Sequence, residues 1–336
     1  MNDNVIALHA ALQTPDMAKV LAAASAYSGF WERRTFDFLP LLHTSVERHY
    51  KGFLTYVEEL AKNAEVLAVG IKSENIEVLL KDLQASGGAP DEEEFLLEEI
   101  QRSAGNIRKK VDVLLVGVKS ATQSIASLPV YDPNRDRRNY LEAQQQLDSN
   151  LQTLTTRLTG KRNELAELEK ALQVFEANGI EKQFEGKLPT VEQVQAMVAT
   201  GATTAGAALA IEQAMEALNK LMGGIQEGMR YSQLQSQRRA LRDQVNEMVA
   251  EQRDREQRAN QLQGYLKALS EYAPLIEKRL EWLAEKNQIR VKLETVRNQL
   301  SSLKLQGIES AQLLNKLLVA LIAYVRHVVD EYKKAF

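Results

Sequence analysis

The chain has 336 residues, and its 42 basic and 45 acidic side chains give a formal net charge of -3 at pH 7. This near-neutral balance produces no overall positive field, so the sequence predicts no nucleic-acid partner. The absence of cysteine excludes disulfides, thiolate catalysis and zinc sites built on cysteine.

The N-terminal residues, MNDNVIALHAALQTPD, begin with an acidic rather than a basic region. They also lack the long apolar core and the small-residue cleavage site of a secretory signal peptide. We therefore expect that any export of this protein uses a route that the sequence does not display.

Helical periodicity dominates the chain, and only 6% of its residues are aromatic. Strand signals are nearly absent, so the sequence predicts an all-α fold. Besides a long helical hairpin, we expect helices at about residues 5–38, 43–85, 275–304 and 308–335, which bury their apolar faces around the upper half of that hairpin.

A coiled-coil pattern runs from Asp136 to about Ala177. Its seam alternates steps of four and three residues: Leu147, Leu151, Leu154, Leu158, Lys161, Leu165, Leu168, Leu172 and Phe175. A second, less regular apolar pattern runs from Ile211 to Leu283. Between the two patterns, Asn178 and Gly179 form a helix stop signal, and Thr190 with Gln193 forms a capping-box pattern. The sequence thus predicts a tight reversal between two antiparallel arms.

If the chain reverses direction at about residue 184, the helix-breaking residues of the two arms come roughly opposite each other. Pro129, for example, then lies close to the register shift near residues 232–238. We therefore predict an elongated rod, in which a multi-helix tail bundle comprises residues 1–130 and 235–336. A long antiparallel coiled-coil stalk comprises residues 131–234, with its tip at about 178–211. The candidate hinges are Gly223, Gly224, Gly228 and Pro274.

The most distinctive segment is QVQAMVATGATTAGAALAI, residues 193–211, which contains no Asp, Glu, Lys, Arg or His. As one helix it would be about 28 Å long, close to the hydrocarbon thickness of about 30 Å in a bilayer. Its many alanines make it too weakly apolar to span a bilayer alone. We interpret it as an insert that enters a membrane only when neighbouring subunits cover its polar face.

The predicted membrane contacts lie in this segment and in the apolar residues that precede it. They are Phe175, Ile180, Phe184, Leu188, Val191, Val194, Met197, Val198, Gly201, Ala202, Ala205, Gly206 and Leu209. A thin alanine-type coiled-coil seam is the alternative interpretation of the same residues.

Signatures of enzymes are missing from the sequence. It has no Walker loop, no dinucleotide-binding glycine pattern, no Gly-x-Ser-x-Gly and no His-Glu-x-x-His motif. The four histidines, His9, His43, His49 and His327, are scattered along the chain. We therefore expect no enzymatic activity, no catalytic residue, no cofactor and no metal site.

With its multi-helix tail, two-helix stalk and weakly apolar tip, the whole chain resembles the helical pore-forming toxins of the cytolysin A-like type. Within that group it looks like the B component of alpha-xenorhabdolysin-type binary cytotoxins, because the A component carries a more apolar foot. The resemblance implies a secreted subunit that is soluble before insertion and lyses target cells. It also implies an A component as partner, target-cell membrane lipid as ligand, and self-association in a ring.

A non-enzymatic coiled-coil scaffold or adaptor is the alternative function. A membrane-sculpting scaffold would be expected to show a basic membrane-binding face, which is not evident in the sequence. An intracellular adaptor needs no membrane feature, and the tip would then have no special role.

Overall fold

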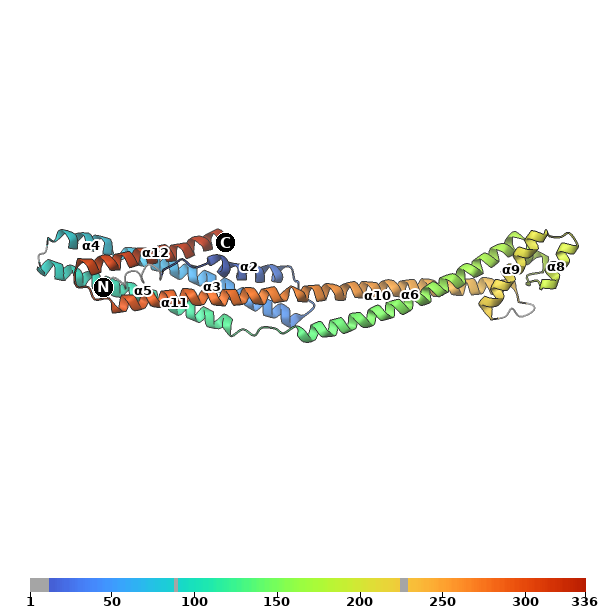
Figure 1. Ribbon diagram of the computed structural model, residues 1–336, viewed down its shortest axis with the longest axis horizontal. Coiled ribbons are helices and arrows are strands. Elements are labelled where there is room, and N and C mark those ends of the chain that lie inside the picture. The colour runs from blue at the N-terminus through green and yellow to red at the C-terminus, as the bar shows by residue number, and fades with distance from the viewer. Residues whose placement is uncertain (1–11, 88–89, 224–228) are drawn as a thin grey trace. The chain divides into compact units, whose positions relative to one another are not determined.

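The structure is a computed structural model that describes residues 12–87, 90–223 and 229–336 (Figure 1). Within these ranges the regular secondary structure is helical, apart from one isolated antiparallel bridge between Lys187 and Arg230. The predicted all-α class is confirmed. The chain divides into two compact units, Met1–Arg135 with Lys267–Phe336, here termed the bundle unit, and Asp136–Leu266, here termed the stalk unit.

Six helices of the bundle unit lie in the described residues. They are α2 (Met17–Glu32), α3 (Pro40–Ser73), α4 (Ile76–Ala85), α5 (Pro90–Ala126), α11 (Tyr272–Ser302) and α12 (Ile308–Ala335). The single helix expected at 43–85 is two helices, because Asn75 adopts a left-handed conformation with φ of 52°. Asparagine tolerates this region better than most residues, and it ends the helical run there.

The core of the bundle unit is built around aromatic side chains from α2, α3 and α11. Phe53 and Tyr56 place their rings edge-on to Trp282, with centroids 5.0 and 4.8 Å away. Tyr27 contacts Phe53 from α2, with ring centroids 5.1 Å apart. Trp282 is fully buried, so this edge-to-face cluster joins three helices that are far apart in the sequence.

Helix α12 is the one helix among the described residues that is long and apolar enough to cross a membrane by length and composition. It packs against α2, α3 and α4. Its buried side chains, including Leu317, Leu321 and Val325, are part of the bundle core. Its hydropathy is therefore explained by burial inside the protein.

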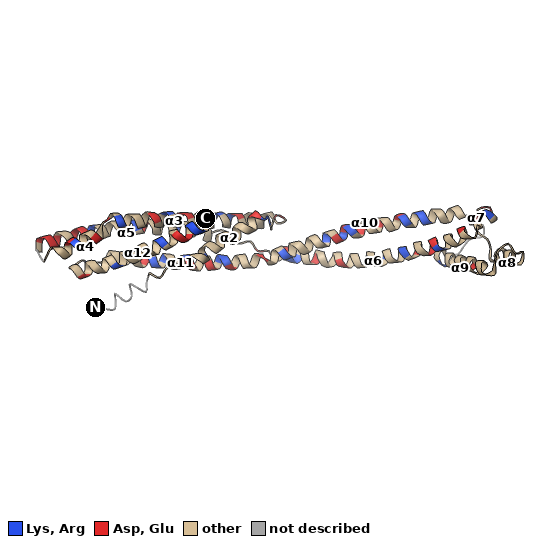
Figure 2. Ribbon diagram, turned by 90° about the horizontal axis from the view of Figure 1, so that it is seen from above, with Lys and Arg blue, Asp and Glu red and all other residues tan. Residues whose placement is uncertain are grey.

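The stalk unit is built on two long helices, α6 (Asn134–Ala177) and α10 (Tyr231–Ser270), with α7 (Ile180–Gln183), α8 (Val191–Ala199) and α9 (Ala205–Met222) between them. Leu154 and Leu158 of the predicted seam are buried on α6. Figure 2 shows charged residues distributed along both long helices, as expected for the solvated faces of a coiled coil.

The prediction that the two arms pair about a reversal at residue 184 is wrong. Glu169 on α6 forms an ion pair with Arg242 on α10, whereas an axis at residue 184 would place residue 199 opposite Glu169. Tyr140 likewise contacts Tyr265, with ring centroids 5.5 Å apart. The axis is displaced because α8 and α9 do not continue the second arm. They form a separate excursion between the two long helices.

The aromatic core generates a stability prediction. Trp282→Ala should lower the free energy of unfolding of the bundle unit by about 3–5 kcal/mol, because it removes a large, fully buried ring. Leu280→Ala, on the same helix but 55% exposed, should change it by about 0.5 kcal/mol or less. Urea denaturation followed by circular dichroism measures both, and equal losses would contradict the assignment of Trp282 to the core.

Candidate functional site

The stalk unit contains a small helical head, residues 168–241, in which the end of α6, helices α7 to α9 and the start of α10 share one hydrophobic cluster. Figure 1 shows α8 and α9 beside the ends of the two long helices. The buried members of the cluster are Leu168, Ala171, Leu172, Phe175, Ile180, Leu188, Val194, Met197, Ala208, Ile211, Ala214, Met215, Leu218, Tyr231, Leu234 and Leu241. The head is therefore a packed miniature bundle.

The uncharged segment 193–211 does not form the single helix that we expected. Gly201 adopts φ of +72°, the left-handed conformation that ends many helices. Its amide donates to the carbonyl of Val198 and the Ala202 amide donates to that of Met197, at 3.1 and 2.9 Å, which is the Schellman pattern. Thr204 then caps α9, because its side chain accepts the amide of Ala207. The segment is thus a helix-turn-helix.

Two local signals around the head are confirmed. Gly179 follows α6 with φ of +66°, as a helix stop requires. The Thr190 side chain accepts the Gln193 amide at 3.3 Å, and the Gln193 side chain accepts the Thr190 amide at 2.9 Å. This reciprocal capping box fixes the start of α8.

A short antiparallel pairing, here termed the clasp (residues 186–188 with 229–231), closes the base of the α8–α9 excursion. The Leu188 amide donates to the Met229 carbonyl at 2.9 Å, and the Tyr231 amide donates to the Gly186 carbonyl at 2.8 Å. Gly186 supplies the left-handed turn into the clasp, with φ of +76°. Everything between the paired segments is therefore a loop closed by backbone hydrogen bonds.

The clasp is tied to α6 through one side chain. The Tyr231 hydroxyl donates to the Glu176 carboxylate at 2.7 Å, and Gln235 donates to the same carboxylate at 3.3 Å. Burial, together with the Glu176 carboxylate, raises the pKa of Tyr231 to about 12. The hydroxyl thus keeps its proton at neutral pH and remains a donor to Glu176.

The predicted membrane contacts divide by exposure. Phe175, Ile180, Leu188, Val194 and Met197 are buried in the cluster, and Phe184 is partly buried against it. The exposed contacts are Val191, Val198, Gly201, Ala202, Ala205, Gly206 and Leu209. The structure therefore brings all thirteen residues into one head, with the larger apolar side chains mostly inside.

Sequence reasoning missed the second half of the cluster. Ile211, Met215 and Leu218 belong to the apolar pattern from Ile211 to Leu283 that predicts the second arm, yet they bury the apolar face of α9. The available signal was Gly201 followed by Thr204, a stop and a cap that separate two short amphipathic patterns.

The hinge candidates have different structural settings. Gly223 caps the end of α9 with φ of +69°. Pro274 is exposed in the first turn of α11, where a missing amide hydrogen costs no helical bond. Gly224 and Gly228 lie outside the described residues. The hinge role of all four stays a prediction.

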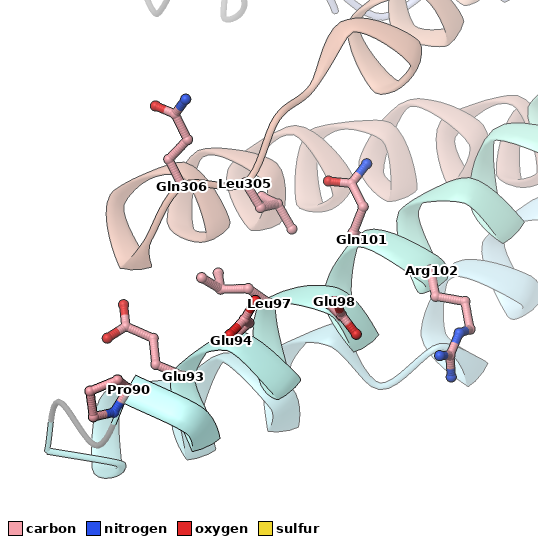
Figure 3. A pocket seen from close by; sticks show the side chains of 9 residues that line it. All are labelled: Pro90, Glu93, Glu94, Leu97, Glu98, Gln101, Arg102, Leu305 and Gln306. Atoms are coloured by element: carbon pink, nitrogen blue, oxygen red, sulfur yellow. The ribbon is translucent and has the colours of Figure 1, made fainter.

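Two observations on the described residues bear on metal binding and on pockets. They contain no group of three or more His, Cys, Asp or Glu side chains that could hold a metal ion. A pocket of about 740 Å³ in the bundle unit is lined by Glu93, Glu94 and Glu98 of α5, across from Leu305 and Gln306 (Figure 3). Its lining contains no His, Cys, Ser or Thr.

The sequence matches no protein-family model and no curated protein. In three dimensions it is similar to XaxB from Xenorhabdus nematophila, with a TM-score of 0.76 and 18% identity over 96% of this chain and 99% of that one. PaxB from Photorhabdus luminescens gives a TM-score of 0.76 and 11% identity, covering 96% of this chain and 97% of that one. This chain has the fold of XaxB and PaxB.

The XaxB-like fold also occurs in an assembled state. A chain of the XaxAB pore complex from Xenorhabdus nematophila matches with a TM-score of 0.65 and 17% identity, over 96% of this chain and 99% of that one. At these identities the shared property is the fold, which confirms the architecture that the sequence resemblance implied.

The turn at Gly201 generates a prediction about the head. Gly201→Ala should destabilise the head by about 1–2 kcal/mol, because alanine disfavours the left-handed conformation. Gly206→Ala is the matched control: Gly206 lies in α9 and no atom of a neighbour lies within 4 Å of the Cβ that alanine would add, so alanine should stabilise that helix by about 0.5–1 kcal/mol. Hydrogen exchange at Ile211 and Met215 measures both, and faster exchange in both variants would contradict this reading of the turn.

Proposed function

We propose that this chain is a subunit of a pore-forming cytotoxin, which oligomerises with a partner component and inserts the tip helices α8 and α9 into a target membrane. The observation that carries the proposal is the match over 96% of the chain to XaxB and to a chain of the XaxAB pore complex. The partner is the equivalent of an A component, and the assembled subunits form a ring. The protein acts without catalysis, is secreted, and is soluble before it inserts.

The burial pattern of the head supports a conformational step. Its exposed apolar side chains are few: Val191 is 44% exposed, Val198 37% and Leu209 56%. The apolar sides of α8 and α9 face the cluster instead, through Val194, Met197 and Ile211. Insertion transfers these side chains from a protein core into lipid, and both environments are apolar.

The free energy of moving these buried side chains out of the cluster is unfavourable in water and close to neutral in lipid. In water, exposing each buried Val, Met or Ile would cost about 1.5–3 kcal/mol. Hydrocarbon removes most of that cost, because apolar side chains do not contact water there either. The head therefore stays closed in solution and opens where lipid is available.

The polar side chains of the segment require neighbours in the membrane. Gln193, Gln195 and Thr204 are exposed in the closed head. Each unsatisfied polar group in hydrocarbon costs several kcal/mol, so a lone pair of helices would not remain inserted. In a ring, these groups face water in the pore or hydrogen-bond to the next subunit. Oligomerisation is therefore part of the mechanism.

The clasp limits which part of the chain has to move. Its backbone hydrogen bonds join the residues before α8 to those before α10, and Tyr231 ties it to α6. Helices α8 and α9 can leave the cluster while these bonds remain. The paired α6 and α10 then keep their register during insertion.

The proposal predicts release of dye from liposomes when this protein is mixed with a purified partner component encoded beside its gene. Neither protein alone should release the dye as fast as the pair, because the pore contains both. The same mixture should lyse red cells and form rings visible by electron microscopy. Absence of both release and rings would favour a scaffold or adaptor over a toxin subunit.

A double change at the tip tests direct contact with lipid. Ala202 and Ala205 are exposed, and aspartate near the first turn of α9 suits the helix dipole, so Ala202→Asp with Ala205→Asp should leave the soluble fold intact. An aspartate in the bilayer costs about 2.5–3.5 kcal/mol, so dye release should fall at least about tenfold.

The matched control for this double variant is Ala166→Asp, at an exposed position on α6 outside the head. It should release dye at the normal rate, since that position does not enter lipid. Normal release by the double variant, with its circular dichroism unchanged, would show that the tip remains outside the membrane.

A further inference from the structure

Two basic residues lie directly opposite each other in the clasp. Lys187 and Arg230 are the paired residues of its antiparallel bridge, and the two backbone hydrogen bonds of the clasp flank them on either side. This pattern defines a non-hydrogen-bonded pair, in which the Cα atoms are about 4.5 Å apart and the side chains leave the backbone on the same face. The backbone therefore places the two cations side by side.

The pair faces solvent on the side of the clasp away from the hydrophobic cluster. Successive side chains of an extended segment point to opposite faces, and the neighbouring Leu188 and Tyr231 are buried in the cluster. Lys187 and Arg230 are both exposed. The carboxylate of Glu176 accepts hydrogen bonds from Tyr231 and Gln235 rather than from either cation. It therefore does not neutralise the pair.

The charges of Lys187 and Arg230 are also not matched by other acids of the described head. The ion pairs that described residues of the head form are Glu216 with Lys220 and Glu169 with Arg242. Within these residues, neither Lys187 nor Arg230 takes part in an ion pair, and neither does Glu185, two residues before Lys187. Like charges directly opposite each other destabilise a strand pair. The pairing that closes the base of the α8–α9 excursion thus includes an unfavourable interaction.

A phosphate group has the chemistry to turn this repulsion into attraction. The planar guanidinium of arginine donates to two phosphate oxygens at once, and the lysine ammonium adds a compact charge with three rotatable donors. A carboxylate has only two oxygens, and the arginine fork alone occupies both. A phosphate group retains a further oxygen for the lysine, so one group can contact both side chains.

We propose that Lys187 and Arg230 together bind a phosphate group on the solvent face of the clasp, and that the bound group strengthens the clasp. The α8–α9 excursion begins and ends at the clasp, so the proposed insertion brings this site to the level of lipid headgroups. A phospholipid headgroup and free inorganic phosphate both supply the group. A lipid source rests on the proposed function, whereas phosphate binding itself does not.

Hydrogen exchange of the full chain tests the site at the amides of Leu188 and Tyr231, which donate the clasp bonds. Millimolar inorganic phosphate should slow their exchange severalfold relative to sodium chloride of the same ionic strength. The double variant Lys187→Gln with Arg230→Gln should not respond, because both ligands of the phosphate are removed. Absence of a response in the wild type would overturn the proposal.

The matched control is Arg157→Gln with Arg162→Gln, which removes the same charge at two exposed positions on α6 outside the head. It should respond to phosphate as the wild type does. If the control and the variant without the clasp cations respond equally, the effect of phosphate is non-specific and the assignment to the clasp is wrong.

A single charge reversal separates repulsion within the pair from binding of phosphate. Lys187→Glu should place an ion pair across the clasp with Arg230, so the clasp amides should exchange more slowly than in the wild type before phosphate is added. Phosphate should then have no further effect, because the glutamate repels it. An undiminished response of this variant to phosphate would overturn the proposal.

Vesicles distinguish the two sources of the phosphate group. The full chain with its partner component is mixed with vesicles of phosphatidylcholine and phosphatidic acid, and vesicle-bound protein is measured by sedimentation. If the headgroup is the ligand, Lys187→Gln with Arg230→Gln should bind severalfold more weakly than the α6 control. If both bind alike while inorganic phosphate still slows exchange at the wild-type clasp, the ligand is a soluble phosphate.

The failure of this inference can be distinguished from the failure of the proposed function. If the wild-type mixture releases no dye and forms no rings, but phosphate slows exchange at the clasp, the proposed function fails and the phosphate site stands. If the mixture forms pores while the clasp amides ignore phosphate, the pore-forming function stands and the phosphate site is wrong.

Discussion

Burial of the apolar sides of α8 and α9 against the ends of α6 and α10 is the interaction on which the head depends. The segment is too poor in large apolar side chains to form a core of its own, so Val194 and Met197 must share one with Phe175 and Leu234. This requirement folds the excursion back onto the long helices. It also leaves the other side of α8, which includes Glu192, Gln193 and Gln195, facing solvent, while Val194 and Met197 are buried in the cluster.

Two different kinds of interaction stabilise this arrangement, the apolar contacts of the cluster and the backbone hydrogen bonds of the clasp. The cluster is non-directional and can be replaced by lipid, whereas the clasp consists of directional backbone bonds that lipid cannot replace. The amides of Leu188 and Tyr231 would remain unsatisfied in hydrocarbon without their partners. In the proposed insertion step, α8 and α9 therefore leave the cluster while the base of the excursion stays paired.

Local signals in the sequence predicted the helices and their caps. Pairings between residues far apart in the sequence could not be predicted from it. Asn178 with Gly179 and Thr190 with Gln193 act within a few residues, so their roles were visible in the sequence. The stop at Gly201 was missed although Thr204 follows it, because Gly201 lies in the same alanine-rich run as Gly206, a glycine within α9. The bond from Leu188 to Met229 joins residues far apart in sequence, so the hairpin axis was misplaced.

The break at Gly201 also limits what the closed head can do at a membrane. Helix α8 has 9 residues and α9 has 18, so they are about 14 and 27 Å long. Only α9 approaches the bilayer thickness of about 30 Å, and from its eighth residue onward it carries Glu212, Glu216 and Lys220. The uncharged part of α9, residues 205–211, is about 10 Å long, a depth suited to the headgroup boundary. In the proposed insertion, crossing the hydrocarbon therefore requires that the turn between α8 and α9 changes or that neighbouring subunits cover these charges.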